Sequence, residues 1–186
     1  LLNEESVPKD AAAIIINAPQ KDFNKNDAQK VIDYLQKGGK AIIVGMHSET
    51  EMPNFASILD TYGVSLTTGP IADNDAQHYY NMGGPLYLLP NVNSSSYTGS
   101  LSGGYVYLPI SLGINYPQNS TTDDTESTEE SKTTYTSLLD TSDDAVAKNN
   151  PNSMQDYGYE DGDDKGPFSV GLAVEDKVDD DHTTQL

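Results

Sequence analysis

The side chains best suited to chemistry stand together in one short segment. His47, Ser48 and Glu49 follow the apolar run Ala41–Val44 and comprise a base, a hydroxyl nucleophile and an acid. A serine hydrolase triad needs three side chains that aim at one another, which neighbours on one turn seldom do, and Gly45–Glu49 lacks the G-x-S-x-G pattern. Because the chain has no cysteine, a thiolate nucleophile is excluded too. We therefore expect a non-catalytic protein, with a degenerate hydrolase as the weakest alternative.

A second polar group follows the first apolar run of the chain. In open α/β sheets, ligands bind beyond the carboxyl ends of the strands, and we expect the loops after the first two strands to lie side by side. They would form a small-ligand or glycan site from Asn17, Gln20, Lys21, Asp22, His47, Ser48 and Glu49. Ordinary loop solvation and helix capping explain the same residues, so a ligand-binding module stays an alternative.

Tyrosines gather in the middle of the chain, between Tyr79 and Tyr107. A tyrosine ring offers flat apolar area and a hydroxyl group, which suits contact with a protein or a saccharide. Tyr79, Tyr80 and Tyr97 are the candidates for such a contact surface. The competing interpretation is that these rings complete the core of a chain with no tryptophan and three phenylalanines.

Motifs for metals and cofactors are incomplete. The three histidines lack any paired-ligand spacing, and Asp161–Gly166 opens like a calcium loop but has Lys165 at position five and Leu172 at position twelve. Gly38-Gly39 precedes a strand instead of opening a helix, which is typical of a helix cap and not of a phosphate-binding loop. We expect no metal and no cofactor, with loose calcium binding by the acidic loops as an open alternative.

Composition limits the partners. The formal net charge is -19, from 29 acidic residues against 10 basic ones, and every basic residue is lysine. Nucleic acids and anionic lipid surfaces are bound through dense positive charge, so neither is expected as a direct partner. No run approaches the roughly 20 apolar residues that span a bilayer, so we expect no membrane insertion by this segment.

Two consecutive apolar runs flank an amphipathic helix pattern and predict the fold. Ala12–Ile16 and Ala41–Val44 are apolar at successive positions, which is typical of parallel strands buried on both faces. Between them, residues 26–37 carry one apolar stripe at i, i+3, i+4 and i+7. We predict an α/β fold, a three-layer α/β/α flavodoxin-like domain with a mainly parallel central sheet, helices on both faces and irregular insertions in its second half.

The chain is expected to be one domain over residues 1–186. Residues 117–136 are mostly Asn, Ser, Thr, Asp and Glu, a composition that predicts a flexible acidic loop. Leu1 begins without a cap and Leu186 follows no evident closing element. We therefore expect a fragment of a longer protein.

Several short segments follow one another in an order that a known family shares. Each segment marks a strand or helix boundary and is weak alone, and together they touch most of the chain outside the acidic loop. The segments are Val7–Ala11, Asn17–Pro19, Tyr34–Lys40, Met52–Phe55, Leu59–Val64, Tyr87–Pro90, Leu138–Ser142, Gly166–Phe168 and Leu172–Glu175. In this order they resemble the gliding-motility-type auxiliary component of ABC transport systems.

The resemblance implies a membrane-anchored bacterial protein whose large soluble part lies at the extracytoplasmic face of the cell membrane. It implies a domain similar to the intraflagellar-transport type, related to the flavodoxin-like fold of class I glutamine amidotransferases. Those enzymes place a cysteine on a strand-to-helix turn, where this chain carries Met46–Glu49, so their activity is not carried over and an amidotransferase-like enzyme stays only the weakest alternative. The implied partners are ABC transporter permease and ATPase subunits or other membrane components.

Overall fold

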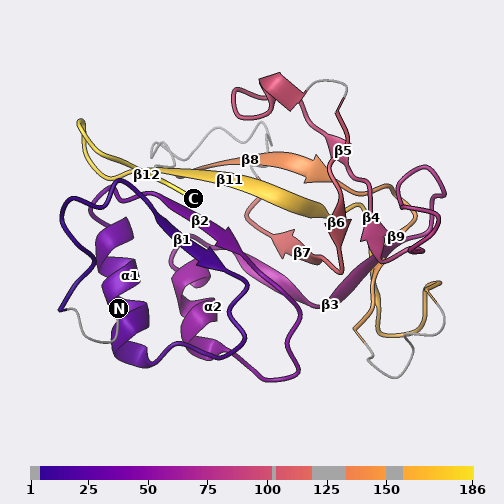
Figure 1. Cartoon of the computed structure of the whole chain (residues 1–186), viewed down its shortest axis with the longest axis horizontal. Coiled ribbons are helices and arrows are strands. Elements are labelled where there is room, and N and C mark those ends of the chain that lie inside the picture. Colours follow the sequence, from indigo (N-terminus) through magenta and orange to yellow (C-terminus); the bar gives the residue numbers. More distant parts are fainter. Residues whose placement is uncertain (1–4, 102–103, 119–132, 150–156) are drawn as a thin grey trace, which may run out of the picture.

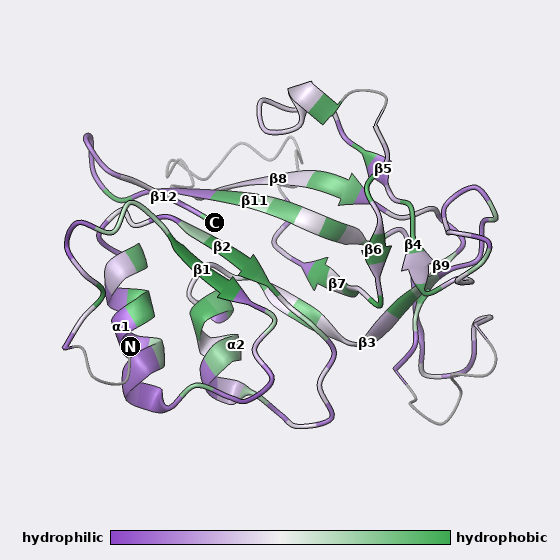
Figure 2. Ribbon diagram, viewed as in Figure 1, coloured by the Kyte–Doolittle hydropathy of each residue, from purple (hydrophilic) through white to green (hydrophobic). Residues whose placement is uncertain are grey.

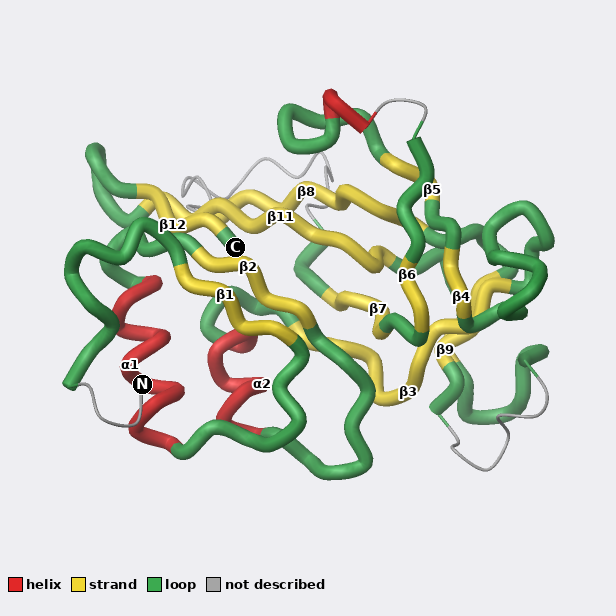
Figure 3. The backbone as a smooth tube through the Cα atoms, in the orientation of Figure 1, coloured by secondary structure: helices red, strands yellow, loops and turns green. Residues whose placement is uncertain are grey.

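The computed structural model describes residues 5–101, 104–118, 133–149 and 157–186. It has two regions. Residues 14–60 form an α/β unit with both α-helices of the described residues, and the remaining strands form a larger antiparallel sheet with two short flanking strands. Figure 3 shows both α-helices at one end of the molecule, whereas a single short helical turn lies elsewhere among strands and loops.

The α/β unit begins with the predicted order of strand, helix and strand and adds a second helix. Its elements are β1 (Ile14–Asn17), α1 (Lys25–Leu35), β2 (Ala41–Val44) and α2 (Pro53–Asp60). The predicted parallel pairing of β1 with β2 is confirmed, in a register that runs from Ile14 opposite Ala41 to Asn17 opposite Val44. Asn24 caps α1 by accepting a hydrogen bond from the Asp27 amide at 2.9 Å, and Gly38 follows α1 with φ +85°, as expected of a left-handed C-cap.

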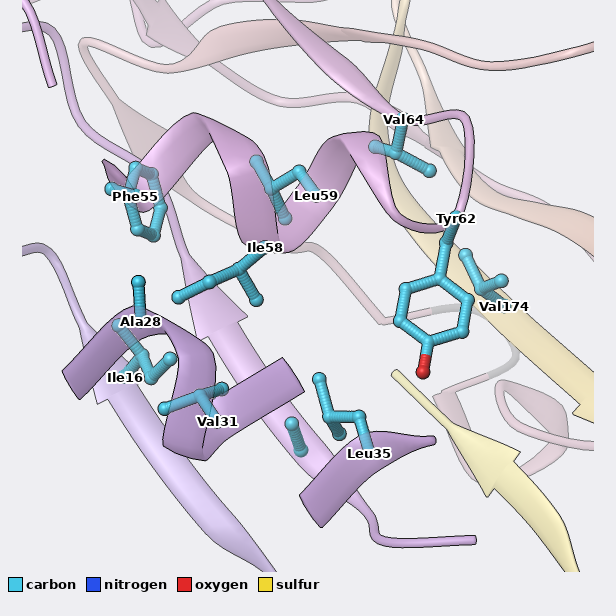
Figure 4. Close-up of a cluster of buried hydrophobic side chains, with 11 residues drawn as sticks. Ile16, Ala28, Val31, Leu35, Phe55, Ile58, Leu59, Tyr62, Val64 and Val174 are labelled. Carbon is cyan, nitrogen blue, oxygen red and sulfur yellow. The ribbon is translucent and has the colours of Figure 1, made fainter. Parts of the chain in front are cut away.

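Both helices cover the same face of β1 and β2. Figure 4 shows side chains of α1 and α2 pointing toward one another over Ile16 of β1. Alternate residues of a strand face opposite ways, so Ile16 and Ala41 are buried while Ile15 and Ile42 are exposed. The prediction of helices on both faces is therefore wrong. The shared core contains Ile16, Ala28, Val31, Leu35, Ala41, Phe55, Ile58, Leu59, Tyr62, Val64 and Val174.

The antiparallel sheet has eight strands in the order β10-β9-β3-β7-β11-β8-β5, with β12 paired to the outer part of β11. A short ribbon of β4 and β6 and the single-turn helix η1 lie beside it (Figure 1). The bounds are β3 Ser65–Asp73, β4 Tyr87–Leu88, β5 Asn91–Val92, η1 Gly99–Leu101, β6 Leu108–Pro109, β7 Leu112–Asn115, β8 Thr133–Asp140, β9 Ala145–Ala147, β10 Asp164–Lys165, β11 Ser169–Lys177 and β12 Thr183–Gln185.

The predicted flavodoxin-like fold is wrong, and with it the likeness to the fold of glutamine amidotransferases. Among the described strands, β1 and β2 form the one parallel pair, apart from the single parallel bridge between Lys40 and Gln185, whereas every strand pairing within the large sheet is antiparallel. Parallel neighbours need a crossover of about a dozen residues or more, usually a helix. Among the described residues after Asp60 there is no further α-helix, so the strands return antiparallel.

The acidic loop predicted over residues 117–136 is only partly described by the structure. Residues 119–132 of the predicted loop lie outside the described residues. The prediction for its last residues is wrong, because Thr133–Thr136 begin β8 and pair with β11.

The last residues of the chain join the two regions. The Gln185 amide donates to the Gly39 carbonyl at 3.4 Å, which extends the edge of β2 toward β12. The buried Thr184 hydroxyl donates to the Leu35 carbonyl at the end of α1. The α/β unit and the large sheet therefore share one core. Among the described residues, no helix has both the length and the apolar character needed to cross a membrane.

Candidate functional site

Asp22, predicted to face a ligand, instead caps α2 from a distance in sequence. Met52 at the N-cap of α2 gives no side-chain cap. The Asp22 carboxylate accepts from the Asn54 amide at 3.1 Å, the Asn54 side chain at 2.7 Å and the Phe55 amide at 2.9 Å. Burial favours the neutral acid, but the hydrogen bonds from Phe55 and Asn54 outweigh it and hold the pKa of Asp22 below its usual value.

The other strand-end residues are held locally or lie in solvent. Gln20 donates to the Ala18 carbonyl at 3.1 Å, and Ser48 donates to the Thr50 carbonyl at 2.9 Å. His47 reaches the Thr68 carbonyl in β3, with 3.2 Å between Nδ1 and the oxygen. The remaining side chains of this group are exposed; they are Asn17, Lys21 and Glu49.

The predicted polar pocket is not assembled by these contacts. Among the described residues, no hydrogen bond or ion pair joins the loop 17–22 to the loop 47–49. The described residues also contain no group of three or more histidines and acids arranged to hold a metal ion. In this structure Asp22 caps α2 and His47 contacts β3, so these two side chains hold other elements of the fold in place.

The predicted tyrosine surface is divided between two places. Tyr80 packs edge-on against Tyr107, with ring centroids 6.0 Å apart, and the backbone of Tyr79 bridges to Leu88 in β4. Tyr97 lies apart from them and donates its hydroxyl to Glu175 Oε1 on β11 at 2.6 Å. This bond to a carboxylate raises the pKa of Tyr97 to about 12.

The apolar face of the β1–β2 pair is exposed to solvent. Ile15 is 70% exposed, its cross-strand partner Ile42 is 60% exposed, and Val44 on the same face of β2 is 43% exposed. We call these three residues the open face. Figure 2 shows both strands coloured as strongly hydrophobic. An apolar patch formed by paired strands is the kind of surface that proteins cover with a partner.

The open face continues into an apolar groove of about 320 Å³ between β2, α2 and the large sheet. Val44 belongs to both. Except for the Ser111 hydroxyl and the Tyr62 phenol, the side chains that line the groove are hydrocarbon, and they include Leu108, Leu138 and Leu172 from three strands of the second half. The groove offers almost no hydrogen-bonding partners and selects apolar contacts.

The same region has an open strand edge. β1 pairs only with β2, and the amides of Ile14 and Ala18 donate to Lys40 and Val44 carbonyls at 2.9 Å each. Backbone groups alternate in direction along a strand, so the amides of Ile15 and Asn17 point away from β2. An edge of this kind accepts an added strand.

The most buried charge in the described residues is structural. Lys148, whose side chain is 0% exposed, donates to Asp163 at 2.6 Å and to the Gly158 carbonyl at 2.7 Å, and reaches Glu160 at 3.2 Å. Burial lowers the pKa of Lys148, but the bonds to Asp163 and Glu160 outweigh burial and raise it overall. The amine therefore stays charged as a clamp on residues 157–163.

Sequence reasoning missed the open face, although its signal was present. The consecutive isoleucines of β1 and β2 indicated apolar side chains on both faces, and the mistake was to assign helices to the second face. The groove had no local signal, because its walls come from strands that are far apart in sequence.

Comparisons with known proteins add little. No protein-family profile and no curated protein matches the chain. A solved structure described as the mmIFT52 N-terminal domain is similar, with a TM-score of 0.47 and 12% sequence identity over 71% of this chain. The similarity covers 54% of that structure, so the chain spans about half its length. We assign no family from it.

Proposed function

We propose that this chain is a non-catalytic interaction domain of a gliding-motility-type ABC transport system. In this proposal it acts at the extracytoplasmic face of a bacterial membrane and contacts the permease through the open face. The exposure of Ile15, Ile42 and Val44 on paired strands is the observation that supports the proposal.

Covering the open face would release free energy. Burying an aliphatic side chain stabilises by roughly 25 cal/mol per Å² of apolar area, so each of the three side chains would contribute on the order of 1 kcal/mol when covered. The neighbouring groove gives a partner's apolar side chains a place to enter. The free amides of Ile15 and Asn17 would add backbone hydrogen bonds to an incoming strand.

Charge favours a basic partner over a second copy of this chain. Two copies would each bring a net charge of -19 to the contact, and like charges repel. A permease loop with apolar residues flanked by lysine or arginine would complement both the open face and the net negative charge of the chain. That chemistry is the requirement that the proposal places on the partner.

The test is co-purification of the full-length protein with the transporter subunits. The variant Ile15→Lys/Ile42→Lys places two charges on the open face without touching the core. We expect recovery of the permease to fall at least about tenfold, since about 1.4 kcal/mol corresponds to a factor of ten. Met82→Lys is the matched control, because Met82 is 87% exposed and is not among the residues of the open face.

Two outcomes would contradict the proposal. The first is undiminished recovery of the permease with the double variant. The second is an equal loss with Met82→Lys, which would indicate a general effect of added charge. Unfolding midpoints of both variants should stay close to that of the parent protein, which separates loss of contact from loss of fold.

A further inference from the structure

A second pocket lies at the opposite end of the α/β unit from the strand-end loops. Its volume is about 460 Å³, and it is lined by Lys9 before β1 and by Lys37 and Lys40 between α1 and β2. It therefore sits at the amino ends of the two parallel strands. Pockets above about 300 Å³ fall within the range of small-molecule sites.

These three lysines are without partners in the part of the chain that the structure describes. The side chains of Lys9, Lys37 and Lys40 are exposed and make no ion pair or hydrogen bond with a described residue. By contrast, Lys30, which also lines the pocket, pairs with Asp27 at 2.9 Å. Three of the four lysines around the pocket therefore keep their charge for a ligand.

The three lysines are not needed to cap the C-terminus of α1. Lysines near a helix C-terminus often bond the last carbonyl groups. Here backbone amides do so: Gln36 donates to Ile32 at 2.9 Å, Gly38 donates to Leu35 at 2.9 Å, and Gly39 donates to the Tyr34 carbonyl at 3.2 Å. The lysine ammonium groups remain available to a ligand.

The charge of the chain is also distributed unevenly. The first 40 residues contain six lysines and six acids, whereas the rest contains four lysines and 23 acids. The whole net charge of -19 therefore lies beyond residue 40. The first 40 residues therefore carry no net charge, and six of the ten lysines of the chain lie within them.

We infer that the lysine pocket, lined by Lys9, Lys37 and Lys40, binds a small hydroxylated organic anion such as a sugar acid or sugar phosphate. The lysines supply point charges for a carboxylate or phosphate group, without the bidentate geometry of arginine. Glu5 and Asp33 also line the pocket and accept hydrogen bonds from hydroxyl groups. Anionic and hydroxyl groups on one ligand therefore match the two kinds of side chain present.

Calorimetric titration of the full chain tests the inference with three probes: glucuronate, inorganic phosphate and glucose. We expect saturable binding of glucuronate or phosphate and none of glucose, because the charged group carries the contact. Binding of phosphate alone would identify the recognised group as phosphate, and binding of glucuronate alone as carboxylate. Binding should weaken as ionic strength rises, because salt screens exposed charges.

Variants distinguish the pocket from general charge. In Lys37→Ala/Lys40→Ala the affinity should fall by at least about tenfold, since a unit charge about 4 Å away is worth on the order of a fivefold factor even in water. Lys21→Ala/Lys25→Ala removes the same charge from two exposed lysines outside the pocket, and the affinity should change less than about twofold.

Three results would overturn the inference. They are no saturable binding of either anion at millimolar concentration, equal binding of glucose, and equal losses in the two double variants. All four lysines are exposed, so circular dichroism should show both variants folded. The variant Lys37→Glu gives a further check, because reversing the charge should abolish binding of the anion.

Discussion

The α/β unit and the far end of the large sheet are held together by different physics. The α/β unit supplies eight of the eleven residues of the main core, six of them from apolar positions at helical spacing on α1 and α2 and two from β1 and β2. The far end has a small cluster of Ile71, Leu88, Ala145 and Ala147 and relies on polar contacts such as Lys148 with Asp163. The comparison teaches that short-range patterns determine the first region and long-range polar contacts determine the second.

The largest expected effect comes from removing the buried ion pair at the far end of the large sheet. Lys148→Met should destabilise the chain by about 4 kcal/mol, because it leaves the buried Asp163 carboxylate without its counter-charge. Urea unfolding would measure the loss. Adding Asp163→Asn removes the unpaired charge and keeps an acceptor for the amides of Asn149 and Glu160, so it should recover part of the loss. A double variant no more stable than Lys148→Met would show that the unpaired charge is not the cause.

The apolar side of the comparison is tested by Ile58→Ala in α2. Ile58 is fully buried in the main core, and truncating a buried isoleucine costs about 3 kcal/mol. The matched control is Ile42→Ala on the open face, which should cost about 0.5 kcal/mol or less. Similar losses in the two variants would mean that the open face is covered in the free protein.

A smaller effect compares a distant helix cap with a local one. Asp22→Ala should lower the free energy of unfolding by about 1 kcal/mol, as Asn24→Ala should at the start of α1. Their pH dependence should differ. The contribution of Asp22 is present above the ordinary pKa of 3.8 and is lost as the pH falls from there through the lowered value in the folded chain.

Unfolding curves between neutral pH and pH 2 would check this sign. The stability difference between parent and Asp22→Ala should shrink at acid pH. That of Asn24→Ala should change less, because Asn24 donates only one of the hydrogen bonds that the Asp27 carboxylate accepts. A constant difference for Asp22→Ala would rule out a charge-assisted cap.

The smallest expected effect comes from removing the hydrogen bond between Tyr97 and Glu175 of the large sheet. Tyr97→Phe removes one hydrogen bond to Glu175 at a half-exposed position, and a loss below about 1 kcal/mol is expected. Spectroscopic titration of the parent should place the pKa of Tyr97 near 12, above that of an ordinary tyrosine. A value near 10 would contradict the bond to Glu175.

The α/β unit and the large sheet also differ in how far their structure could be predicted from the sequence. The four elements of the α/β unit were predictable because their apolar positions repeat within a few residues, and the pairing of β1 with β2 follows from the short crossover through α1. The antiparallel return of later strands was not predictable, because β3 pairs with β7 and β9, and β11 pairs with β7 and β8, across long separations. The open face could also be predicted only in part. The apolar runs were visible in the sequence, but which face of β1 and β2 stayed exposed depended on the placement of α2.

The most direct test of the proposed function is amide hydrogen exchange of the domain with and without the purified permease. The account predicts slower exchange on binding at the free β1 edge, at the amides of Ile15 and Asn17, with no change in the core of α1. Protection confined to other strands, with β1 and β2 unchanged, would contradict the claim that the open face is where this chain meets its partner.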